Sequence, residues 1–368
     1  MEQQVKLLPY GVADFVTVIE QNLYYVDKTM FIPELEKQPR NLFFIRPRRF
    51  GKSIFLSMLY SYYDCTQSHK FQSLFGNLWI GQHPTPLQGK YQVLFLDFSQ
   101  ITGNIDKLET KFNSYLSINL DAFLRQYSDY YQAEMEEILA QEDFEEKMEL
   151  IFKAAKAHQY HLYLIIDEYD NFTNVILNER GEKIYHAITH ADGFYRDVFK
   201  KFKGNFERIF MMGVSPVTLD DVTSGFNIGW NISIKPEFDE MLGFSTTDVV
   251  EMFTYYKKHG SIPADSDIDA IVNDMKPWYD NYCFAKQALK KKTRMFNCDM
   301  VLYYLRNYMD AGCPPEEMID PNTRTDYGKM KKLLQFDKLD GERKGIIRKI
   351  AEEEQIVTQL YESFSAYQ

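Results

Sequence analysis

The sequence predicts an α/β protein with a parallel sheet flanked by helices, followed by a helical C-terminal part. Short apolar runs without polar alternation recur along the first two thirds of the chain, which is typical of strands buried on both faces. Amphipathic stretches of helical length separate these runs, and strands that alternate with helices favour a parallel sheet. Beyond residue 243 the apolar runs give way to helical patterns.

The elements follow in a regular order. The four predicted strands are residues 42–45, 92–98, 162–166 and 208–212. The lead-in carries a helix capped by Asp14, a short strand at 24–26 and a helix capped by Thr29. Long helical stretches cover 105–127 and 131–158, and later helices cover 246–257, 265–275, 299–308, 326–336 and 343–353. We therefore expect a lead-in (1–40), a core (41–243) and a helical lid or relay domain (244–368).

Residues 41–59, NLFFIRPRRFGKSIFLSML, contain the most informative motif. An apolar strand, a basic turn, Gly51-Lys52-Ser53 and an apolar-rich helix follow one another, which is the order of a phosphate-binding P-loop. Such motifs usually begin with glycine, and here that position is Arg46. The alternative interpretation is an ordinary surface turn that contains Gly-Lys-Ser.

The P-loop interpretation predicts ATP and Mg²⁺ as ligands. Lys52 would place a positive charge on the β- and γ-phosphates, and the Ser53 hydroxyl would bind Mg²⁺. Glycine before the lysine lets backbone N–H groups close around phosphate oxygens, and the helix N-terminus points at the same anion. The predicted nucleotide-binding residues are Arg48, Arg49, Phe50, Gly51, Lys52, Ser53 and Ile54.

The third predicted strand ends in two adjacent acids, Asp167 and Glu168. This pattern is typical of a Walker-B strand, in which Asp167 would hold Mg²⁺ and Glu168 would polarise the attacking water. The predicted catalytic residues are therefore Lys52, Glu168 and Ser215, and the predicted metal ligands are Ser53 and Asp167. The alternative is a strand end whose acids simply face solvent.

Ser215 follows the fourth strand, where a polar residue could sense the γ-phosphate. We expect that strand to lie between the P-loop strand and the Walker-B strand. Capping of the turn before Pro216 explains the same hydroxyl equally well.

Other residues near these motifs carry open alternatives. Arg48 and Arg49 could contact phosphate, serve a neighbouring subunit as an arginine finger, or form a solvated basic turn. Asp170 and Asn171 could tune Mg²⁺, although capping of the next helix is the simpler role. The Ser-Gly-Phe-Asn stretch at 224–227 fits either a ligand-side loop or a structural turn.

Composition narrows the function classes. The formal net charge of −11 and only short basic clusters give no broad nucleic-acid-binding face. The four cysteines are scattered, which argues against a zinc site or a disulfide framework. The N-terminus lacks the features of a signal peptide, and no apolar run has the length of a membrane span. We therefore expect a cytoplasmic protein without membrane contact.

The chain resembles the bacterial AAA-ATPase-like family, distant kin of STAND-type and archaeal-type P-loop ATPases. The resemblance rests on LPYGVADF (8–15), YYVDKT (24–29), FIRPRRFGKS (44–53), LIIDEYDN (164–171), GVSPVTLDDVTSGFNI (213–228), GFS (243–245), WYDNYCFA (278–285) and DPNTRTDY (320–327). It implies a nucleotide-binding core followed by a helical domain, and it implies that arginine is tolerated at Arg46. Members often continue into a PD-(D/E)xK nuclease domain, which would lie beyond Gln368. Asn281 and Cys283 stand where glycine and arginine are commoner in the family.

Two main functions remain for the sequence. The first is an ATP-binding and ATP-hydrolysing regulatory switch, coupled to a nuclease acting on DNA or to a partner protein. The second is a non-hydrolysing nucleotide-binding or protein-interaction module, and Glu168 argues against it because binding alone needs no such carboxylate. A small-molecule kinase is a weaker third, since no acceptor-site motif is evident. Oligomerisation and DNA binding stay open.

Overall fold

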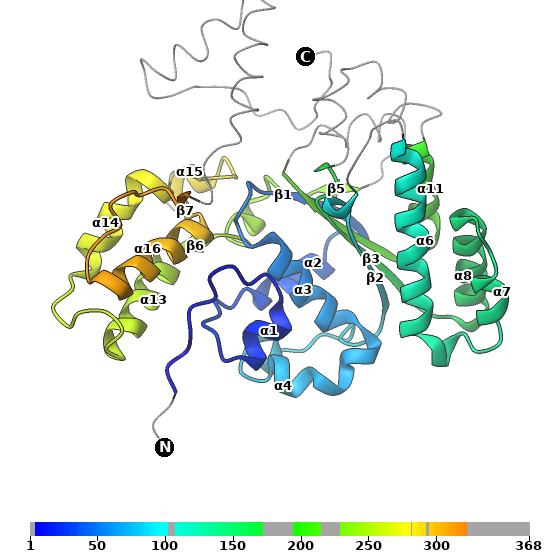
Figure 1. Cartoon of the computed structure of the whole chain (residues 1–368), viewed down its shortest axis with the longest axis horizontal. Coiled ribbons are helices and arrows are strands. Elements are labelled where there is room, and N and C mark those ends of the chain that lie inside the picture. The colour runs from blue at the N-terminus through cyan, green and yellow to red at the C-terminus, as the bar shows by residue number, and fades with distance from the viewer. Residues whose placement is uncertain are drawn as a thin grey trace, which may run out of the picture.

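The protein is a central sheet covered by helices on both faces, with a helical part at one side (Figure 1). The computed structural model describes residues 4–101, 107–171, 194–214, 229–280, 282–291 and 294–321. The predicted helices at 326–336 and 343–353 lie outside these residues, as do Ser215, Asn281 and the stretch 224–227.

The predicted parallel sheet is confirmed. Its strands are β1 (Asn41–Ile45), β2 (Gln92–Asp97), β3 (Leu162–Asp167), β4 (Arg208–Gly213) and β5 (Trp230–Asn231). They lie in the order β2-β3-β4-β1-β5, and every neighbouring pair is parallel. As expected, β4 separates the P-loop strand β1 from the Walker-B strand β3. The carboxyl ends of all three strands therefore meet at one edge, where open α/β sheets bind ligands.

Helices cover the two faces of the sheet because alternate strand residues point to opposite sides. Leu164 and Ile166 join one core cluster, whereas Tyr163 and Ile165 join the other. The first face is covered by α6 (Leu108–Gln126), α7 (Met135–Leu139), α8 (Phe144–His158) and α11 (Phe194–Asn205). The second is covered by α1 (Phe15–Glu20), α2 (Ile32–Glu36), α3 (Lys52–Tyr63), α4 (Phe71–Phe75) and α5 (Trp79–Gln82).

The C-terminal part has its own apolar cluster, built from both aliphatic and aromatic side chains. Its elements are β6 (Phe244–Ser245), α13 (Thr246–Lys258), α14 (Ile268–Tyr279), α15 (Ala288–Lys291), β7 (Met295–Phe296) and α16 (Cys298–Ala311). Short 3₁₀ helices lie at Thr29–Phe31, Cys65–Lys70, Phe98–Gln100, Ser128–Tyr130 and Pro236–Phe238. The lead-in bridges core and helical part, since Tyr24 packs on Tyr255 and Tyr256 while Lys28 pairs with Asp248 at 2.8 Å.

Three local predictions are wrong. Residues 24–26 form no strand, because their aromatic side chains pack on helices: Tyr24 on α13 and Tyr25 on Phe15 of α1. Thr29 is not a helix cap; its own N–H and hydroxyl donate to Asp27. The cap of α13 is Ser245, one residue before Thr246, and Asp248 completes a capping box with it.

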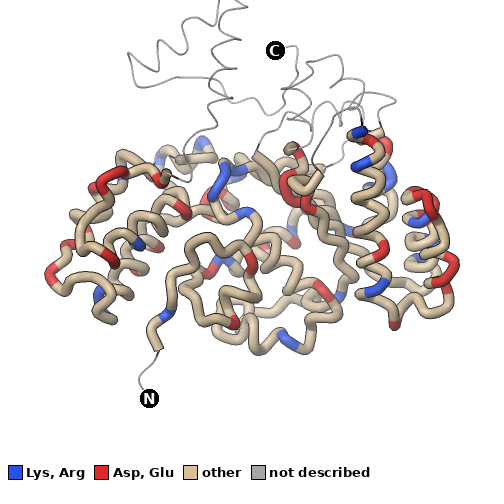
Figure 2. The backbone as a smooth tube through the Cα atoms, viewed as in Figure 1, with Lys and Arg blue, Asp and Glu red and all other residues tan. Residues whose placement is uncertain are grey.

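Charged residues of both signs are interspersed along the chain (Figure 2). Members of the short basic clusters at 46–49 and 200–203 form ion pairs with acidic residues: Arg49 contacts Asp299, Lys200 contacts Asp197, and Lys201 contacts Glu145. Among the described residues, no helix combines the length and apolar character needed to cross a bilayer.

Candidate functional site

The loop between β1 and α3 is shaped to expose backbone N–H groups. Arg49 and Gly51 adopt left-handed conformations, with φ of 69° and 83°. Gly51 is the N-cap of α3 and offers no side chain, so the first N–H groups of the helix have no side-chain cap. Free N–H groups and the helix dipole together favour an anion at this position.

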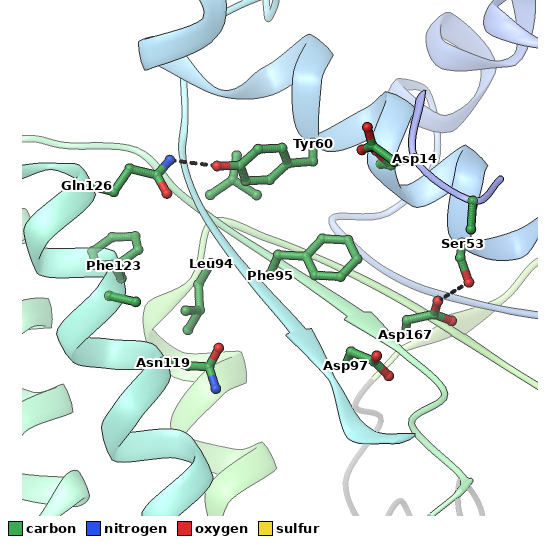
Figure 3. Close-up of a pocket in the computed structure, with 14 residues that line it drawn as sticks. Asp14, Ser53, Tyr60, Leu94, Phe95, Asp97, Asn119, Phe123, Gln126 and Asp167 are labelled. Carbon is green, nitrogen blue, oxygen red and sulfur yellow. Dashed lines mark hydrogen bonds between the residues drawn. The ribbon is translucent and has the colours of Figure 1, made fainter. Parts of the chain in front are cut away.

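Ser53 and Asp167 are brought together across the site (Figure 3). The Ser53 hydroxyl donates to Asp167 Oδ2 at 2.6 Å, although 114 residues separate them. The Asp167 carboxylate is 4% exposed, and burial raises its pKa to about 6. Its other oxygen accepts the Glu168 N–H at 2.9 Å. The two predicted metal ligands therefore form one oxygen-rich corner, in which Asp167 is buried and Ser53 is exposed.

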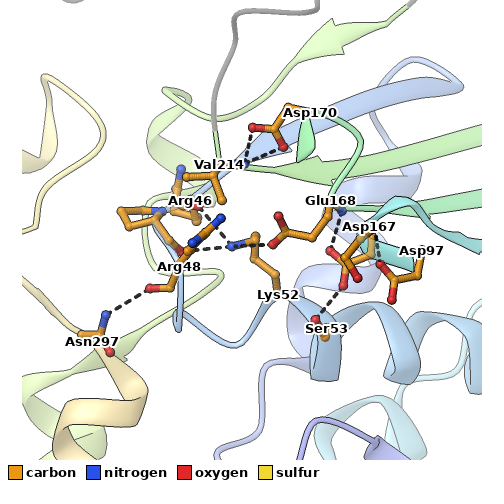
Figure 4. Close-up of polar contacts among 12 residues, drawn as sticks. Arg46, Arg48, Lys52, Ser53, Asp97, Asp167, Glu168, Asp170, Val214 and Asn297 are labelled. Atoms are coloured by element: carbon orange, nitrogen blue, oxygen red, sulfur yellow. Dashed lines mark hydrogen bonds and ion pairs between the residues drawn. The ribbon is translucent and has the colours of Figure 1, made fainter. Parts of the chain in front are cut away.

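Lys52 and Glu168 also meet at this site (Figure 4). Lys52 Nζ lies 3.7 Å from Glu168 Oε1 and donates to the carbonyl oxygens of Arg46 and Pro47, at 3.3 and 3.1 Å. Burial lowers the pKa of Lys52, and the nearby Glu168 carboxylate opposes that shift. Both charged groups thus face the space above the loop.

Glu168 has a left-handed backbone, with φ of 51°. This conformation is uncommon for a residue with a long side chain, and such strain concentrates at functional sites. The left-handed conformation of Glu168 comes directly after the end of β3 at Asp167. The turn directs the Glu168 carboxylate toward Lys52 rather than along the strand.

The end of β4 is tied to the same corner by Asp170. This buried carboxylate accepts the Val214 N–H through both oxygens, at 3.1 and 3.2 Å. The bond joins the segment after β3 to the end of β4. Neither of the two roles considered for Asp170, tuning of Mg²⁺ or capping of the next helix, anticipated this contact.

Arg46 does not face the phosphate site. Its side chain is 1% exposed and lies between the rings of Phe44 and Phe284, with guanidinium-to-centroid distances of 3.9 and 3.8 Å. It donates to the carbonyls of Ser233 and Phe238 at 2.8 and 2.9 Å. Burial lowers the pKa of Arg46 to about 9, so the group stays charged at neutral pH. Arg46 is therefore a structural anchor beneath the loop.

The remaining predicted ligand residues divide by orientation. The Phe50 ring is fully buried and packs edge-on against Tyr282, with centroids 4.7 Å apart, so only its backbone can meet a phosphate. Arg48 is exposed at the loop surface, whereas Arg49 pairs with Asp299 at 3.1 Å. Ile54 lies in the first turn of α3, beside an apolar cavity.

A family model described as "Predicted AAA-ATPase" matches residues 9–223, which include the loop, β3 and β4. The chain belongs to the AAA-ATPase-like family. Membership indicates ATP binding. An "Uncharacterized protein in vnfD 5'region" from Azotobacter chroococcum mcd 1 is similar, with 27% identity over 293 residues. That match takes in 77% of this chain and 50% of the relative, so the chain spans about half the relative's length.

In this AAA-ATPase-like protein, residues outside the matched region hold the P-loop from its far side. Asn297 donates to the Arg48 carbonyl at 3.2 Å, and the Gly243 N–H donates to the Phe50 carbonyl at 3.1 Å. Gly243 has φ of 90°, and an added Cβ would lie 3.0 Å from the Phe50 ring. Sequence analysis missed Asn297, although its position before a helix identifies it as a cap.

An apolar cavity of about 100 Å³ lies beside Gly51, between the lead-in and the helical part. Its walls include Pro9, Tyr25, Ile54, Leu242, Phe244 and Leu302. Apolar walls next to a phosphate loop suit a flat heterocycle, but the space is smaller than the roughly 300–1,000 Å³ of typical ligand pockets. A base that enters here must move the lead-in and the helical part apart.

Replacing Asp167 with asparagine should stabilise the nucleotide-free protein while removing the effect of Mg²⁺ on ATP binding. Because burial raises the folded-state pKa of Asp167, stability is lost as pH rises from about 4 through 6. Asp167→Asn avoids that loss, and we expect a gain of about 1–3 kcal/mol at pH 7 in urea unfolding. The gain should vanish below about pH 4, where both side chains are neutral. A pH-independent difference would contradict this reasoning.

Proposed function

We propose that this AAA-ATPase-like chain binds ATP with Mg²⁺ at the loop between β1 and α3 and hydrolyses it. The observation that supports the proposal is the Ser53–Asp167 hydrogen bond, with Lys52 and Glu168 directly beside it. Two of these groups come from the first turn of α3 and two from the end of β3, and each has the chemistry that phosphoryl transfer to water needs.

The residues fit both ligands. Mg²⁺ prefers hard oxygen donors, and the exposed Ser53 hydroxyl and the buried Asp167 carboxylate supply them side by side. Open N–H groups at Gly51 and the first turn of α3, with Lys52, supply the positive potential for phosphates. Mg²⁺, when bound, would neutralise charge that develops on the phosphate oxygens.

Glu168 would act as the general base. Its carboxylate faces the phosphate side of the loop, where it can orient a water and accept its proton. In the nucleotide-free site it is paired with Lys52 at 3.7 Å. A γ-phosphate that attracts Lys52 would release Glu168 for this role. Ser215 stays a predicted sensor of the same phosphate.

The Lys52–Glu168 pair also favours a second function. If the pair persists with nucleotide bound, Glu168 stays occupied, and the chain is a nucleotide-binding switch that does not hydrolyse ATP. The two functions differ in turnover but share the binding site. They are therefore separated by measuring binding and phosphate release on the same preparation.

Replacing Lys52 with alanine should weaken Mg²⁺-ATP binding by about 10- to 100-fold, because a charge-assisted contact with the phosphates is lost. Isothermal titration calorimetry on the purified chain measures this directly. Lys90→Ala is the matched control, since Lys90 is an exposed lysine just before β2, at the opposite end of the strands from the loop. Equal affinities for the wild type and Lys52→Ala would refute the assigned phosphate site.

We further propose that the helical part reports nucleotide occupancy. The N-terminus of α16 contacts the loop through Asn297 and Asp299, and the apolar cavity lies between this helix and the lead-in. A phosphate that attracts Arg49 would weaken its pair with Asp299. Occupancy would then loosen or reposition α16 through contacts already present.

Replacing Asp299 with asparagine should uncouple α16 from the nucleotide. In the wild type, Mg²⁺-ATP should change amide hydrogen exchange in the first turns of α16, and Asp299→Asn should reduce that change. ATP affinity should shift only about two- to fivefold, because the Arg49–Asp299 pair is partly exposed. Asp310→Asn, at the exposed far end of α16, is the control. If amide hydrogen exchange in α16 of the wild type did not change on addition of Mg²⁺-ATP, the proposed relay would be contradicted.

The output of such a switch would be an activity carried by a partner protein or by an attached nuclease domain that acts on DNA. The family resemblance supports this, as does the greater length of the Azotobacter relative. This proposal is tested by expressing the full coding sequence of the gene and measuring whether its product cleaves DNA in an ATP-dependent way. Cleavage that does not respond to Lys52→Ala would argue against coupling.

A further inference from the structure

A second cavity, of about 700 Å³, opens at the free edge of the sheet (Figure 3). It lies between α3 and α6 and is floored by β2, the edge strand of the sheet. Ser53 and Asp167 lie at one end of it, and Asn119 and Gln126 of α6 lie at the other side. Its volume is within the range of small-molecule sites.

The backbone of β2 presents one unused hydrogen-bonding pair to this cavity. The Gln92 N–H points to β3, where it donates to the His161 carbonyl. Alternate residues of a strand point the other way, and the N–H groups of Val93 and Asp97 indeed donate to tyrosine hydroxyls of α6 and its C-terminal end. Phe95 lies midway between Val93 and Asp97, so its N–H and carbonyl face the same side.

Between the two positions that the tyrosines occupy, the outward-facing backbone groups of one residue of β2, Phe95, remain open. Tyr127 satisfies Val93 and Tyr115 satisfies Asp97, each at 2.7 Å. Within the described chain, the Phe95 N–H and carbonyl have no such partner. An added β-strand would need the neighbouring positions as well, and those are taken. The gap therefore suits a small ligand with a single donor and acceptor.

The walls specify the rest of the ligand. The partly exposed Phe95 side chain and the Tyr60 ring, with centroids 6.2 Å apart, supply flat apolar surface. The ionisable acids along the cavity are Asp14, Asp97 and Asp167, and among the residues that the structure describes no lysine or arginine lines it. The resulting negative potential favours a positively charged group.

We propose that this cavity is a binding site for a compact ligand that carries one amide group and one positive charge. The amide pairs with the Phe95 N–H and carbonyl, and the cation lies toward Asp97. The site is separate from the apolar cavity beside Gly51. Its occupant would meet the nucleotide site only at the Ser53–Asp167 end.

The test uses 4-aminobutanamide, which has one amide and one ammonium group, with butylamine (cation without amide) and butanamide (amide without cation) as comparisons. Titrations are followed by NMR at the Phe95 amide of the full chain. 4-Aminobutanamide should shift this resonance with a dissociation constant on the order of 1 mM, and each comparison compound should bind about tenfold more weakly. No shift at Phe95, or equal binding by all three, would overturn the proposal.

Two substitutions at Phe95 isolate the backbone contact. Phe95→Ala keeps the N–H and loses the ring, whereas Phe95→Pro removes the N–H at an edge position that tolerates proline. Proline should weaken binding about tenfold more than alanine does, measured by calorimetry. Equal losses would mean that the backbone is not recognised.

If Phe95→Pro fails to fold, Asn119→Leu decides the question. Leucine places a larger, apolar side chain on the α6 wall of the cavity and should prevent binding of a polar, charged ligand, while Ser114→Ala on the exposed face of α6 should leave binding unchanged. Binding that survives Asn119→Leu would overturn the proposal. The proposal would also be overturned if Mg²⁺-ATP alone shifted the Phe95 resonance and prevented the probe from binding. The cavity would then belong to the nucleotide site.

Discussion

Replacing Arg46 with glycine, the residue that P-loops usually carry at this position, should destabilise the protein by about 3–5 kcal/mol. The substitution removes a buried cation that holds the carbonyls of Ser233 and Phe238 and lies between two aromatic rings. It also leaves the buried Asp239 carboxylate without the positive charge beside it. Urea unfolding of the nucleotide-free chain measures the change.

Arg48→Gly is the matched control for this experiment, because Arg48 is exposed in the same loop and should cost less than about 1 kcal/mol. The comparison tests whether the loss of stability comes from the buried contacts of Arg46 or from the removal of any arginine from this loop. If Arg46→Gly were as stable as the wild type, the anchoring role would be wrong. The usual glycine would then be compatible with this fold.

Replacing Glu168 with glutamine should lower the rate of ATP hydrolysis by about 10²- to 10⁴-fold, the usual contribution of a general base. Glutamine keeps the size of the side chain and its left-handed backbone but cannot accept the proton from water. ATP binding should stay within a few-fold of wild type, since Lys52, Ser53 and Asp167 are intact. Single-turnover phosphate release, with calorimetry for binding, separates the two effects.

Glu237→Gln, which alters a half-exposed carboxylate of the core, should leave turnover unchanged. If Glu168→Gln also left it unchanged, the base would have to be another group. Retained binding with lost turnover would instead place Glu168 in the chemical step.

The sequence predicted which residues meet at the ends of the strands where the signal is a short local motif. Gly51-Lys52-Ser53 and Asp167-Glu168 are local patterns, and the alternation of strands and helices brings their strand ends together. The placement of β4 between β1 and β3 was also expected, and the structure confirms it. Ser215, which depends on that placement, stays a prediction.

Contacts between distant segments could not be predicted in this way. The carbonyls that hold Arg46 come 187 and 192 residues later, and nothing in FIRPRRFGKS indicates them. Asn297 reads as a helix cap whether or not a P-loop lies beside it. Residues 24–26 have the composition of a strand, but Tyr24 packs on α13 and Tyr25 packs on Phe15 of α1 instead. In each case tertiary packing decides the role of a side chain.

The central claim is that the site formed by Lys52, Ser53, Asp167 and Glu168 hydrolyses ATP. Phosphate release by the purified chain with saturating Mg²⁺-ATP, measured beside Lys52→Ala and Glu168→Gln, tests it most directly. We expect steady release by the wild type and only background release by both variants. Wild-type release no greater than that of Lys52→Ala, with or without DNA or a partner protein, would contradict the claim and leave a nucleotide-binding module.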